Sequence, residues 1–413
     1  MRIRLASAVF LATIAPAIAQ DPPTSPDPTR SQRGSDFSEP FVDTGNTMAK
    51  ELAERQGITV GEATRTLRRA HAAGQLARKF QRENPSEFAG TFASDDGITV
   101  FLKTGPGAAE ALTRARGAVD AAFTSEVRIA PVQHSLADLK GRASQLESQL
   151  GRPTDLVGYR IDYRTNRLSI LSQDVERTRA HVRSRLGSLP EDVPVEAAPP
   201  IELTQTTNAF GGTTANSGVT SGCPTFGYVV IRQSDRALGL LTVAHAATTT
   251  MRYNGYAASA LSSCSGGTSV TQRGVYQTPH STLAGQDFAW YSSSAHNYTP
   301  HYWDGSYVQT VYGAVYPSGG APVCKFGRRT LRTCGTATGA EVYNGGYGWM
   351  QEVRKNAGYT QMNDVGDSGG PVWSGTGTGV GIVHAKQGTE IMLVATFAAF
   401  VEHNLPIRLY CVC

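Results

Sequence analysis

The chain has 413 residues, a formal net charge of +4, 44 glycines and six cysteines. This length exceeds what one ordinary hydrophobic core supports, so we expect two or more domains. The mild charge argues against a dedicated nucleic-acid binder, and no stretch after the N-terminus is apolar over the length of a bilayer, so we expect neither nucleic-acid nor membrane partners.

The N-terminus has the features of a secretory signal. Arg2 and Arg4 precede an apolar run from Leu5 to Ile14, and Ala17-Ile18-Ala19 offers a cleavage site of small residues. We therefore expect residues 1–19 to be a signal peptide and the protein to be secreted and extracellular. The Pro-, Ser- and Asp-rich residues 20–41 that follow are expected to form a flexible leader.

Residues 42–190 predict an α+β domain. Two alternating stretches predict hairpins, one around Asp95-Asp96-Gly97 and one turning at Thr165-Asn166, and they resemble each other as an internal repeat would. Thr59 to Glu62 has the pattern of a capping box. Helices are expected over residues 59–82, 108–122, 136–150 and 174–186.

The two halves of the chain differ in composition. Residues 1–206 hold 26 Lys+Arg and 25 Asp+Glu, whereas residues 207–413 hold 12 and 9, together with 30 of the 44 glycines and all six cysteines. Residues 191–206 are rich in proline and predict an exposed linker, where proteolytic cleavage concentrates. Residues 207–413 predict an all-β barrel or sandwich with disulfides, because short Val/Tyr/Thr-rich runs alternate with Gly/Ser/Asn clusters.

The segment Gly366-Asp367-Ser368-Gly369-Gly370-Pro371 carries the strongest chemical signal. Ser368 could act as a nucleophile, and the N–H groups of Gly366 and Ser368 could form an oxyanion hole. Gly369 and Gly370 would leave room for a substrate beside the serine. The alternative is a glycine-rich turn with an incidental serine.

His245 and Asp287 are the candidates for a base and its orienting carboxylate. His245 ends the apolar run that begins at Leu238, and Asp287 enters the apolar strand that reaches Trp290. Taken alone, the first could be a packed or solvated histidine and the second a turn aspartate. Together with Ser368 they occur in the order His, Asp, Ser, which is one of the known orders of a catalytic triad.

These motifs resemble those of the chymotrypsin-like serine proteases, in the branch of α-lytic protease and the streptogrisins. The likeness covers nearly all of the chain. Its further segments are Asn208-Ala209-Phe210-Gly211-Gly212, similar to the start of the mature enzymes, and Cys324 to Gly335, similar to a disulfide-closed segment. The paired hairpins resemble the pro-region of that branch, which is a folding catalyst and inhibitor before it is cut away.

The resemblance implies two six-stranded antiparallel β-barrels, with His245 and Asp287 from the first and Ser368 from the second. It implies a serine endopeptidase made as a preproenzyme, which hydrolyses peptide bonds through an acyl-enzyme and processes itself near Thr206. Asp367 would pair with Lys325 as structural support. We expect a monomeric mature enzyme without cofactor or metal, with protein or peptide substrates and its own pro-region as partners.

The resemblance also implies disulfides. Cys324–Cys334 would close the segment already named, and Cys223 would pair with Cys264, because Ala246 stands where the family has a cysteine. Cys411 and Cys413 could pair with each other, remain free or link chains.

The first specificity pocket is expected to be mainly apolar and to suit apolar side chains. It would be lined by residues from two segments: Met362, Asn363, Val365, Val383, His384 and Lys386. His384 leaves two alternatives open, since glutamate-preferring relatives place a histidine in this region, whereas the ring could instead point away or hydrogen-bond Asp287. A rival from another class is an inactive protease-like binding module.

Overall fold

The structure is a computed structural model. It describes residues 47–103, 108–119, 121–151, 153–188, 190–203, 213–216, 224–256, 268–277, 284–294, 296, 298–305, 308–375 and 377–412. The expected signal peptide, the leader and the maturation site near Thr206 lie outside these residues. No helix within the described residues is long and apolar enough to cross a membrane.

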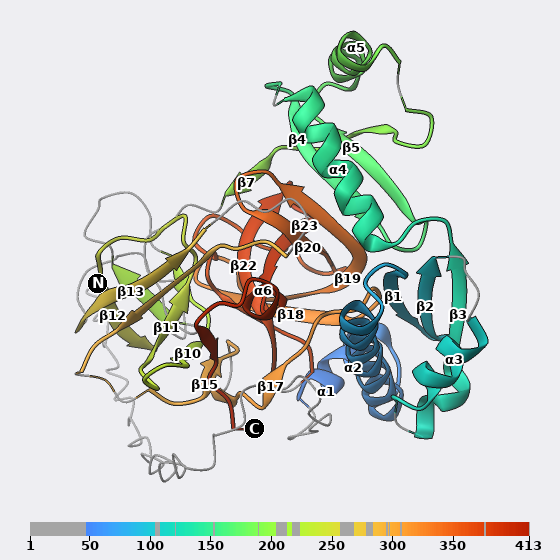
Figure 1. Cartoon of the computed structure of the whole chain (residues 1–413). Helices are drawn as coiled ribbons and strands as arrows, with labels where there is room; N and C mark the ends of the chain where they lie inside the picture. The colour runs from blue at the N-terminus through green and yellow to red at the C-terminus, as the bar shows by residue number, and fades with distance from the viewer. Residues whose placement is uncertain are drawn as a thin grey trace, which may run out of the picture.

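The N-terminal half forms an α+β region, which occupies the lower right and the top of Figure 1. Its helices are α1 (Thr47–Gln56), α2 (Val60–Glu83), α3 (Ala108–Arg116), α4 (Leu136–Leu150) and α5 (Val175–Leu186), with a 3-10 helix at Ala121–Glu126. Its strands are β1 (Phe88–Ser94), β2 (Gly97–Lys103), β3 (Val127–Val132), β4 (Leu156–Asp162), β5 (Arg167–Ser172) and β6 (Val195–Ala197).

Local signals in the sequence account for these elements. Thr59 and Glu62 form the expected capping box of α2, and Ser135 and Asp138 form another at the start of α4. Both predicted hairpins are confirmed, since β1 pairs antiparallel with β2 and β4 with β5. The apolar residues of α2 recur every three or four positions and are buried: Ala63, Leu67, Ala70, Ala73, Ala77 and Phe80.

The second half consists mainly of β-strands and forms two antiparallel barrels, as the resemblance implied. The strands of the first barrel are β8 (Thr213–Asn216), β9 (Thr225–Phe226), β10 (Val229–Arg232), β11 (Leu238–Thr242), β12 (Thr250–Tyr256), β13 (Thr268–Tyr276) and β14 (Phe288–Ser292), with β24 (Ile407–Leu409) added at β10. The sheet curls until the segment after β9 meets β11, where Gly227 N–H donates to Leu241 O at 2.7 Å.

The second barrel is a closed ring of six antiparallel strands. They are β18 (Pro322–Gly327), β19 (Leu331–Asn344), β20 (Gly348–Lys355), β21 (Pro371–Trp373), β22 (Thr378–Gln387) and β23 (Ile391–Thr396). The ring runs β18-β21-β22-β23-β20-β19 and closes because β19 also pairs with β18. Shorter elements complete the half: β15 (His301–Trp303), β16 (Val308–Thr310), β17 (Gly313–Ala314) and α6 (Ala398–Glu402).

The α+β region and the second barrel share one continuous sheet. Strand β4 pairs antiparallel with β19, with Tyr159 opposite Tyr343. One buried apolar cluster includes Tyr159 and Ile161 of β4 together with Trp349 and Val353 of β20. The α+β region is therefore packed on the barrel as part of one core.

A second joint involves strand β7 (Ile201–Leu203), which lies between the α+β region and the first barrel in the sequence. It pairs antiparallel with the end of β22, with Leu203 opposite Ala385 and Ile201 opposite Gln387. The chain therefore lays its own linker along the edge of β22.

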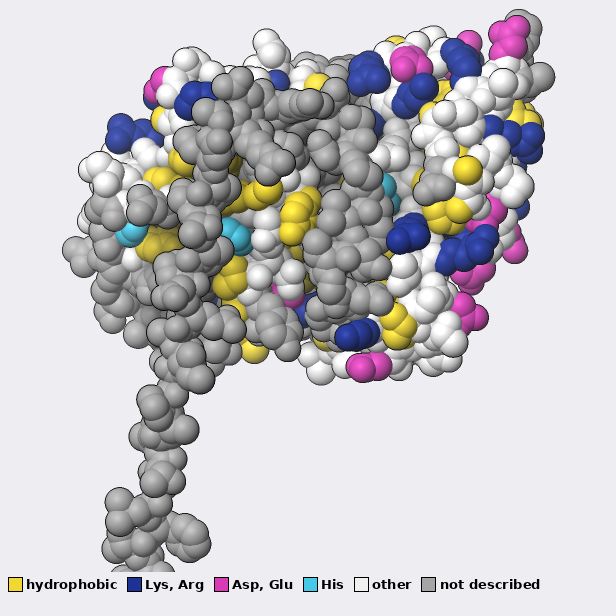
Figure 2. All heavy atoms as spheres, turned by 90° about the horizontal axis from the view of Figure 1, so that it is seen from below, with side chains coloured by type: hydrophobic (Ala, Val, Ile, Leu, Met, Phe, Trp, Pro, Cys, Tyr) yellow, Lys and Arg dark blue, Asp and Glu magenta, His cyan; other side chains and the backbone are white. Residues whose placement is uncertain are grey.

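Charge is distributed unevenly over the surface, in keeping with the composition of the two halves. On the face drawn in Figure 2, acidic side chains lie mostly on the side where Figure 1 places the α+β region.

Candidate active site

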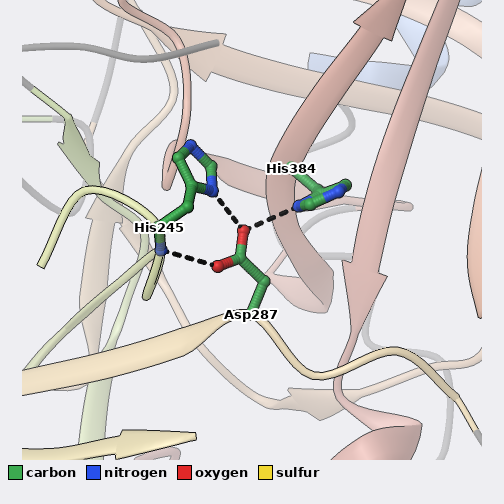
Figure 3. A group of neighbouring side chains, drawn as sticks. All are labelled: His245, Asp287 and His384. Carbon is green, nitrogen blue, oxygen red and sulfur yellow. Dashed lines mark hydrogen bonds and ion pairs between the residues drawn. The ribbon is translucent and has the colours of Figure 1, made fainter. Parts of the chain in front are cut away.

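Two paired strands of the first barrel bring His245 and Asp287 together. His245 follows the end of β11 by three residues, and Asp287 directly precedes β14. Because Thr242 of β11 lies opposite Ala289 of β14, the two side chains leave neighbouring strand ends. Figure 3 shows them pointing toward each other, with His384 of β22 on the other side of the carboxylate.

The Asp287 carboxylate accepts four hydrogen bonds. Its Oδ1 accepts from the backbone N–H groups of Ala244 and His245, both at 2.9 Å. Its Oδ2 accepts from His245 Nδ1 at 2.6 Å and from His384 Nδ1 at 2.7 Å. Asp287 and His384 are fully buried, and the His245 side chain is 2% exposed.

These contacts determine the protonation state of the Asp287 carboxyl group. Burial by itself would raise the pKa of Asp287, but the His245 ring and the hydrogen bonds from His245 and His384 outweigh burial and hold the pKa well below its ordinary value. The group therefore stays ionised at neutral pH. A carboxylate bound to His245 Nδ1 leaves the other ring nitrogen, Nε2, to act on a proton elsewhere.

His245 Nε2 and the Ser368 hydroxyl are not yet bonded to each other. The Nε2 atom is buried and has no hydrogen-bond partner within the described part of the chain. Ser368 Oγ donates to the carbonyl of His384 at 3.3 Å.

The loop before Ser368 is held by a buried ion pair. Lys325 Nζ on β18 lies 2.8 Å from Asp367 Oδ2, and both side chains are fully buried. Asp367 Oδ1 also accepts the N–H groups of Arg329 and Thr330, at 2.7 and 3.1 Å. Burial lowers the pKa of Lys325, and the neighbouring Asp367 opposes this effect. The expected pairing of Asp367 with Lys325 is present.

The glycines around the serine serve the packing of the main chain. Gly366 has φ +121°, a conformation that residues with a side chain rarely adopt. A Cβ on Gly369 would lie 1.9 Å from the Thr225 carbonyl oxygen, and one on Gly370 would lie 2.1 Å from that of Phe326. The Cβ positions of both glycines are therefore occupied by the protein's own backbone. That Gly369 and Gly370 leave room for a substrate beside Ser368 stays a prediction.

The residues expected to line the specificity pocket lie on two adjoining segments. Met362, Asn363 and Val383 are buried, whereas Val365 is exposed. Asn363 Nδ2 donates to the carbonyl of Ala385 at 3.1 Å. These positions join the loop before the serine to β22.

Lys386 adds an ionic contact between the same two segments. Its Nζ lies 3.0 Å from Asp364 Oδ1, and the side chains are 18% and 23% exposed. Sequence reasoning placed Lys386 in the pocket but overlooked Asp364. The ion pair holds the Lys386 ammonium at the side of the loop that precedes Ser368.

The contacts of His384 differ from those expected of a residue that lines the specificity pocket. Its Nδ1 is bonded to Asp287, and its Nε2 lies 3.1 Å from Asn344 Nδ2. The ring also packs on the ring of Tyr347, at a centroid distance of 4.9 Å. Of the two sequence alternatives, the structure has the hydrogen bond to Asp287.

Asn344 and Tyr347 are site residues that the sequence analysis missed. Both belong to the hairpin between β19 and β20, far from the motifs in the chain. No local pattern marks them, and only the closure of the second barrel brings that hairpin to His384.

The group of His245, Asp287 and His384 also resembles a set of metal ligands, since its ligand-type atoms lie within 4.8 Å of one another. Two ligands of one tetrahedral zinc ion, each at about 2.0 to 2.1 Å from it, are about 3.3 Å apart. The two Nδ1–Oδ2 distances are 2.6 and 2.7 Å, which are hydrogen-bond lengths. The two histidine rings are therefore joined to Asp287 by hydrogen bonds.

The cysteines outside the site are partly described. Cys324 and Cys334 form a disulfide between β18 and β19. Cys411 is also disulfide-bonded. Cys223, Cys264 and Cys413 lie outside the described residues, so the pairing of Cys223 with Cys264 stays a prediction.

No family model matches the chain. Among solved structures, it is similar to Thermobifida fusca protease A (22% identity, 45% of this chain and 90% of that one, TM-score 0.34). It is also similar to a glutamic-acid-specific serine protease described as using a histidine triad in substrate binding (21% identity, 49% of this chain and 100% of that one, TM-score 0.35). A third similar structure is an α-lytic protease homologue, N4 (16% identity, 44% of this chain and 91% of that one, TM-score 0.33). These structures are serine proteases of the kind that the motifs resemble.

Proposed function

We propose that the protein is a serine endopeptidase with Ser368 as nucleophile, His245 as base and Asp287 as the orienting carboxylate. The observation that carries the proposal is the buried His245, whose Nδ1 is held by an ionised Asp287 while its Nε2 has no partner in the described structure. An imidazole with one nitrogen fixed by a carboxylate and the other unpaired is suited to take a proton from a hydroxyl group.

The proposed reaction follows from this arrangement. Ser368 Oγ turns from the His384 carbonyl toward His245 Nε2, gives up its proton and attacks the carbonyl carbon of the scissile peptide bond. The oxyanion is stabilised by the N–H groups of Gly366 and Ser368. His245 then gives the proton to the leaving amine, and water hydrolyses the acyl-enzyme by the same route.

The edge of β22 supports the proposal of an extended peptide substrate. Peptides often bind by adding a strand to an exposed sheet edge, with backbone hydrogen bonds giving affinity. Ile201–Leu203 already pairs in this way with Ala385–Gln387, directly after His384. A segment of the chain's own linker thus lies where we expect a substrate to bind.

This placement favours self-processing as part of the proposal. The α+β region would be a pro-domain, inhibitory while joined, and cleavage near Thr206 would follow the segment that lies on β22. The protein would be secreted as a preproenzyme. For specificity we retain the apolar preference, because Met362 and Val383 are buried apolar residues and His384 is engaged by Asp287.

Labelling with a fluorophosphonate tests the proposed nucleophile. We expect stoichiometric modification of Ser368 in the secreted protein, and loss of labelling and of peptide hydrolysis in Ser368→Ala. Ser374→Ala is a matched control, because Ser374 is a nearby buried serine whose Oγ donates to Pro322 O at 2.8 Å. Correctly folded wild-type protein that hydrolyses no peptide and takes no label would refute the enzyme and favour the binding module.

Mass analysis of the secreted product tests processing. We expect wild type to be cut near Thr206 and Ser368→Ala to remain intact. Normal cleavage of the Ser368→Ala chain would assign maturation to a different protease. A peptide-library profile would then show whether apolar residues precede the bond that is cut.

A further inference from the structure

His384 lies at the centre of the candidate site, and each part of it makes a defined contact. Its ring bonds Asp287 and Asn344 through the two nitrogens. Its main-chain carbonyl accepts the hydroxyl of Ser368 at 3.3 Å. One residue of β22 therefore contacts both the carboxylate from the first barrel and the serine from the second.

The contacts determine which ring nitrogen of His384 carries its proton. The Asn344 amide nitrogen can only donate, so His384 Nε2 must accept, and the proton of a neutral ring is on Nδ1. Nδ1–H then donates to Asp287 Oδ2 at 2.7 Å. Burial lowers the pKa of His384, with Asp287 opposing this effect, so the ring is neutral when it donates.

A neutral donor suits this position. The His245 and His384 rings are 5.7 Å apart between centroids. A second positive charge at that distance would oppose protonation of His245 during the reaction, whereas a neutral N–H stabilises Asp287 without adding charge. Without His384, Asp287 Oδ2 would depend on the mobile His245 ring alone, and only Oδ1 would stay held by the N–H groups of Ala244 and His245.

We propose that His384 is a positioning residue, which fixes the orientation of Asp287 through Nδ1–H and thereby the orientation and basicity of His245. The inference rests on the proposed serine endopeptidase. It deepens that proposal by assigning a fourth side chain to the reaction, in place of the role in substrate selection that the sequence suggested for His384.

The electrostatic surroundings predict the sign of the effect. Within the described residues, two further titratable groups face Asp287 and His384. They are His245, which follows β11, and Tyr347 in the β19–β20 turn, whose own pKa is raised by burial and by Asp287. Removing the His384 donor leaves more of the Asp287 charge to act on His245. The protonated ring of His245 is then favoured, so activity should be lost at a higher pH on the acid side.

Two variants separate the donor from the bulk of the ring. His384→Asn keeps an N–H donor where Nδ1 lies but cannot titrate, and His384→Leu keeps similar bulk without a donor. His301→Leu is the matched control, because His301 is a half-buried histidine on the separate β15–β16 sheet.

The kinetic test compares kcat, KM and the pH profile of kcat/KM. For His384→Leu we expect kcat to fall on the order of 10- to 100-fold, less than for loss of the carboxylate, with little change in KM. On the acid side of its kcat/KM profile, the pH at which activity is lost should rise by roughly half to one pH unit. His384→Asn should have most of the wild-type kcat and should lose activity at the same pH as wild type on the acid side. His301→Leu should match wild type in kcat, KM and pH profile.

The outcomes are distinguishable from failure of the proposed function. A wild type that takes no fluorophosphonate overturns both proposals. If wild type is active and labelled, the His384→Leu variant decides between the two roles. A change in its KM and cleavage preference, with the acid side of the pH profile unchanged, overturns the positioning role and restores the substrate-binding one. If His384→Leu does not fold, ring ¹⁵N NMR of Ser368→Ala decides: a proton on His384 Nδ1 supports the inference, and one on Nε2 alone overturns it.

Discussion

Lys325 and Asp367 form the ion pair on which the serine loop rests. Because both are fully buried, removing the cation would leave the Asp367 carboxylate buried without its ion-pair partner. We expect Lys325→Met to lower the free energy of unfolding by about 3–5 kcal/mol. Denaturant unfolding in a Ser368→Ala background, chosen to prevent the proposed self-cleavage, measures the change.

Lys355→Met is a suitable control for that variant. Lys355 pairs with Glu390 at 3.1 Å in the same barrel, but Glu390 is 52% exposed. A pair open to water contributes about 0–1 kcal/mol, so its loss should change little. Equal effects of the two substitutions would contradict a special role for the buried pair.

At this scale the sequence predicted residues with a local motif and missed those without one. Ser368, His245 and Asp287 each stand in a recognisable segment, as does Lys325 next to Cys324. The contact between His384 and Asp287 joins residues 97 positions apart, and Asn344 reaches His384 from another strand. Nothing in the neighbouring residues encodes such contacts, because they depend on how two barrels are placed.

Helix α4 begins with a capping box that can be tested on its own. Ser135 Oγ accepts the N–H of Asp138 at 3.0 Å and is buried. We expect Ser135→Ala to lower the free energy of unfolding of the α+β region by about 1 kcal/mol. Ser148→Ala, on the exposed face of the same helix, should have a smaller effect when measured by the same unfolding transition.

The other half of the box gives a pH dependence. Burial would raise the pKa of Asp138, but the Ser135 N–H and Lys103 outweigh it and lower the pKa. The contribution of the Asp138 carboxylate to stability is therefore present above about pH 4 and is lost as the pH falls through the lowered value. The stability difference between wild type and Asp138→Asn should shrink below pH 4; a constant difference from pH 7 to pH 3 would contradict this.

Elements with clear end signals were predicted closely. The expected helix over 136–150 is α4, bounded by its cap at Ser135 and by Gly151. The helix expected over 108–122 is wrong at its end, because α3 stops at Arg116 and a 3-10 helix follows at Ala121–Glu126. Gly117, whose N–H bonds Thr113 O at 3.0 Å, is the stop signal that the periodicity argument overlooked.

The joint between the α+β region and the second barrel contains a buried ion pair. Lys140 Nζ of α4 lies 2.7 Å from Glu341 Oε2 of β19, and both side chains are 4% exposed. Glu341 also accepts a hydrogen bond from the Tyr316 hydroxyl. The contact between the two regions thus depends on a charge from each.

Loss of Lys140 should therefore loosen the joint. Breaking such a pair costs about 3–5 kcal/mol, so we expect Lys140→Met to increase amide hydrogen exchange in β4 at least on the order of 100-fold. The Ser368→Ala chain is the background, and Arg179→Met, which breaks an exposed pair with Glu176, is the control. Unchanged exchange in β4 would show that apolar packing alone holds the two regions together.

At the scale of the molecule, composition predicted two regions of different fold but gave no account of their union. The strand that begins at Leu156 was expected to pair within its hairpin. In the structure it also pairs with β19, so that Tyr159 lies opposite Tyr343. An edge strand carries no mark of its partner in the sequence, since any strand of matching pattern can form the same backbone hydrogen bonds.

The strand β7 on the edge of β22 has a consequence for the newly made protein. A site that binds extended peptides must keep a strand edge with unpaired backbone groups, and such edges are where chains aggregate. By covering Ala385–Gln387 with Ile201–Leu203, the chain closes this edge with a segment of its own. We therefore expect newly made copies of the protein to be less prone to join strand to strand than copies without this segment.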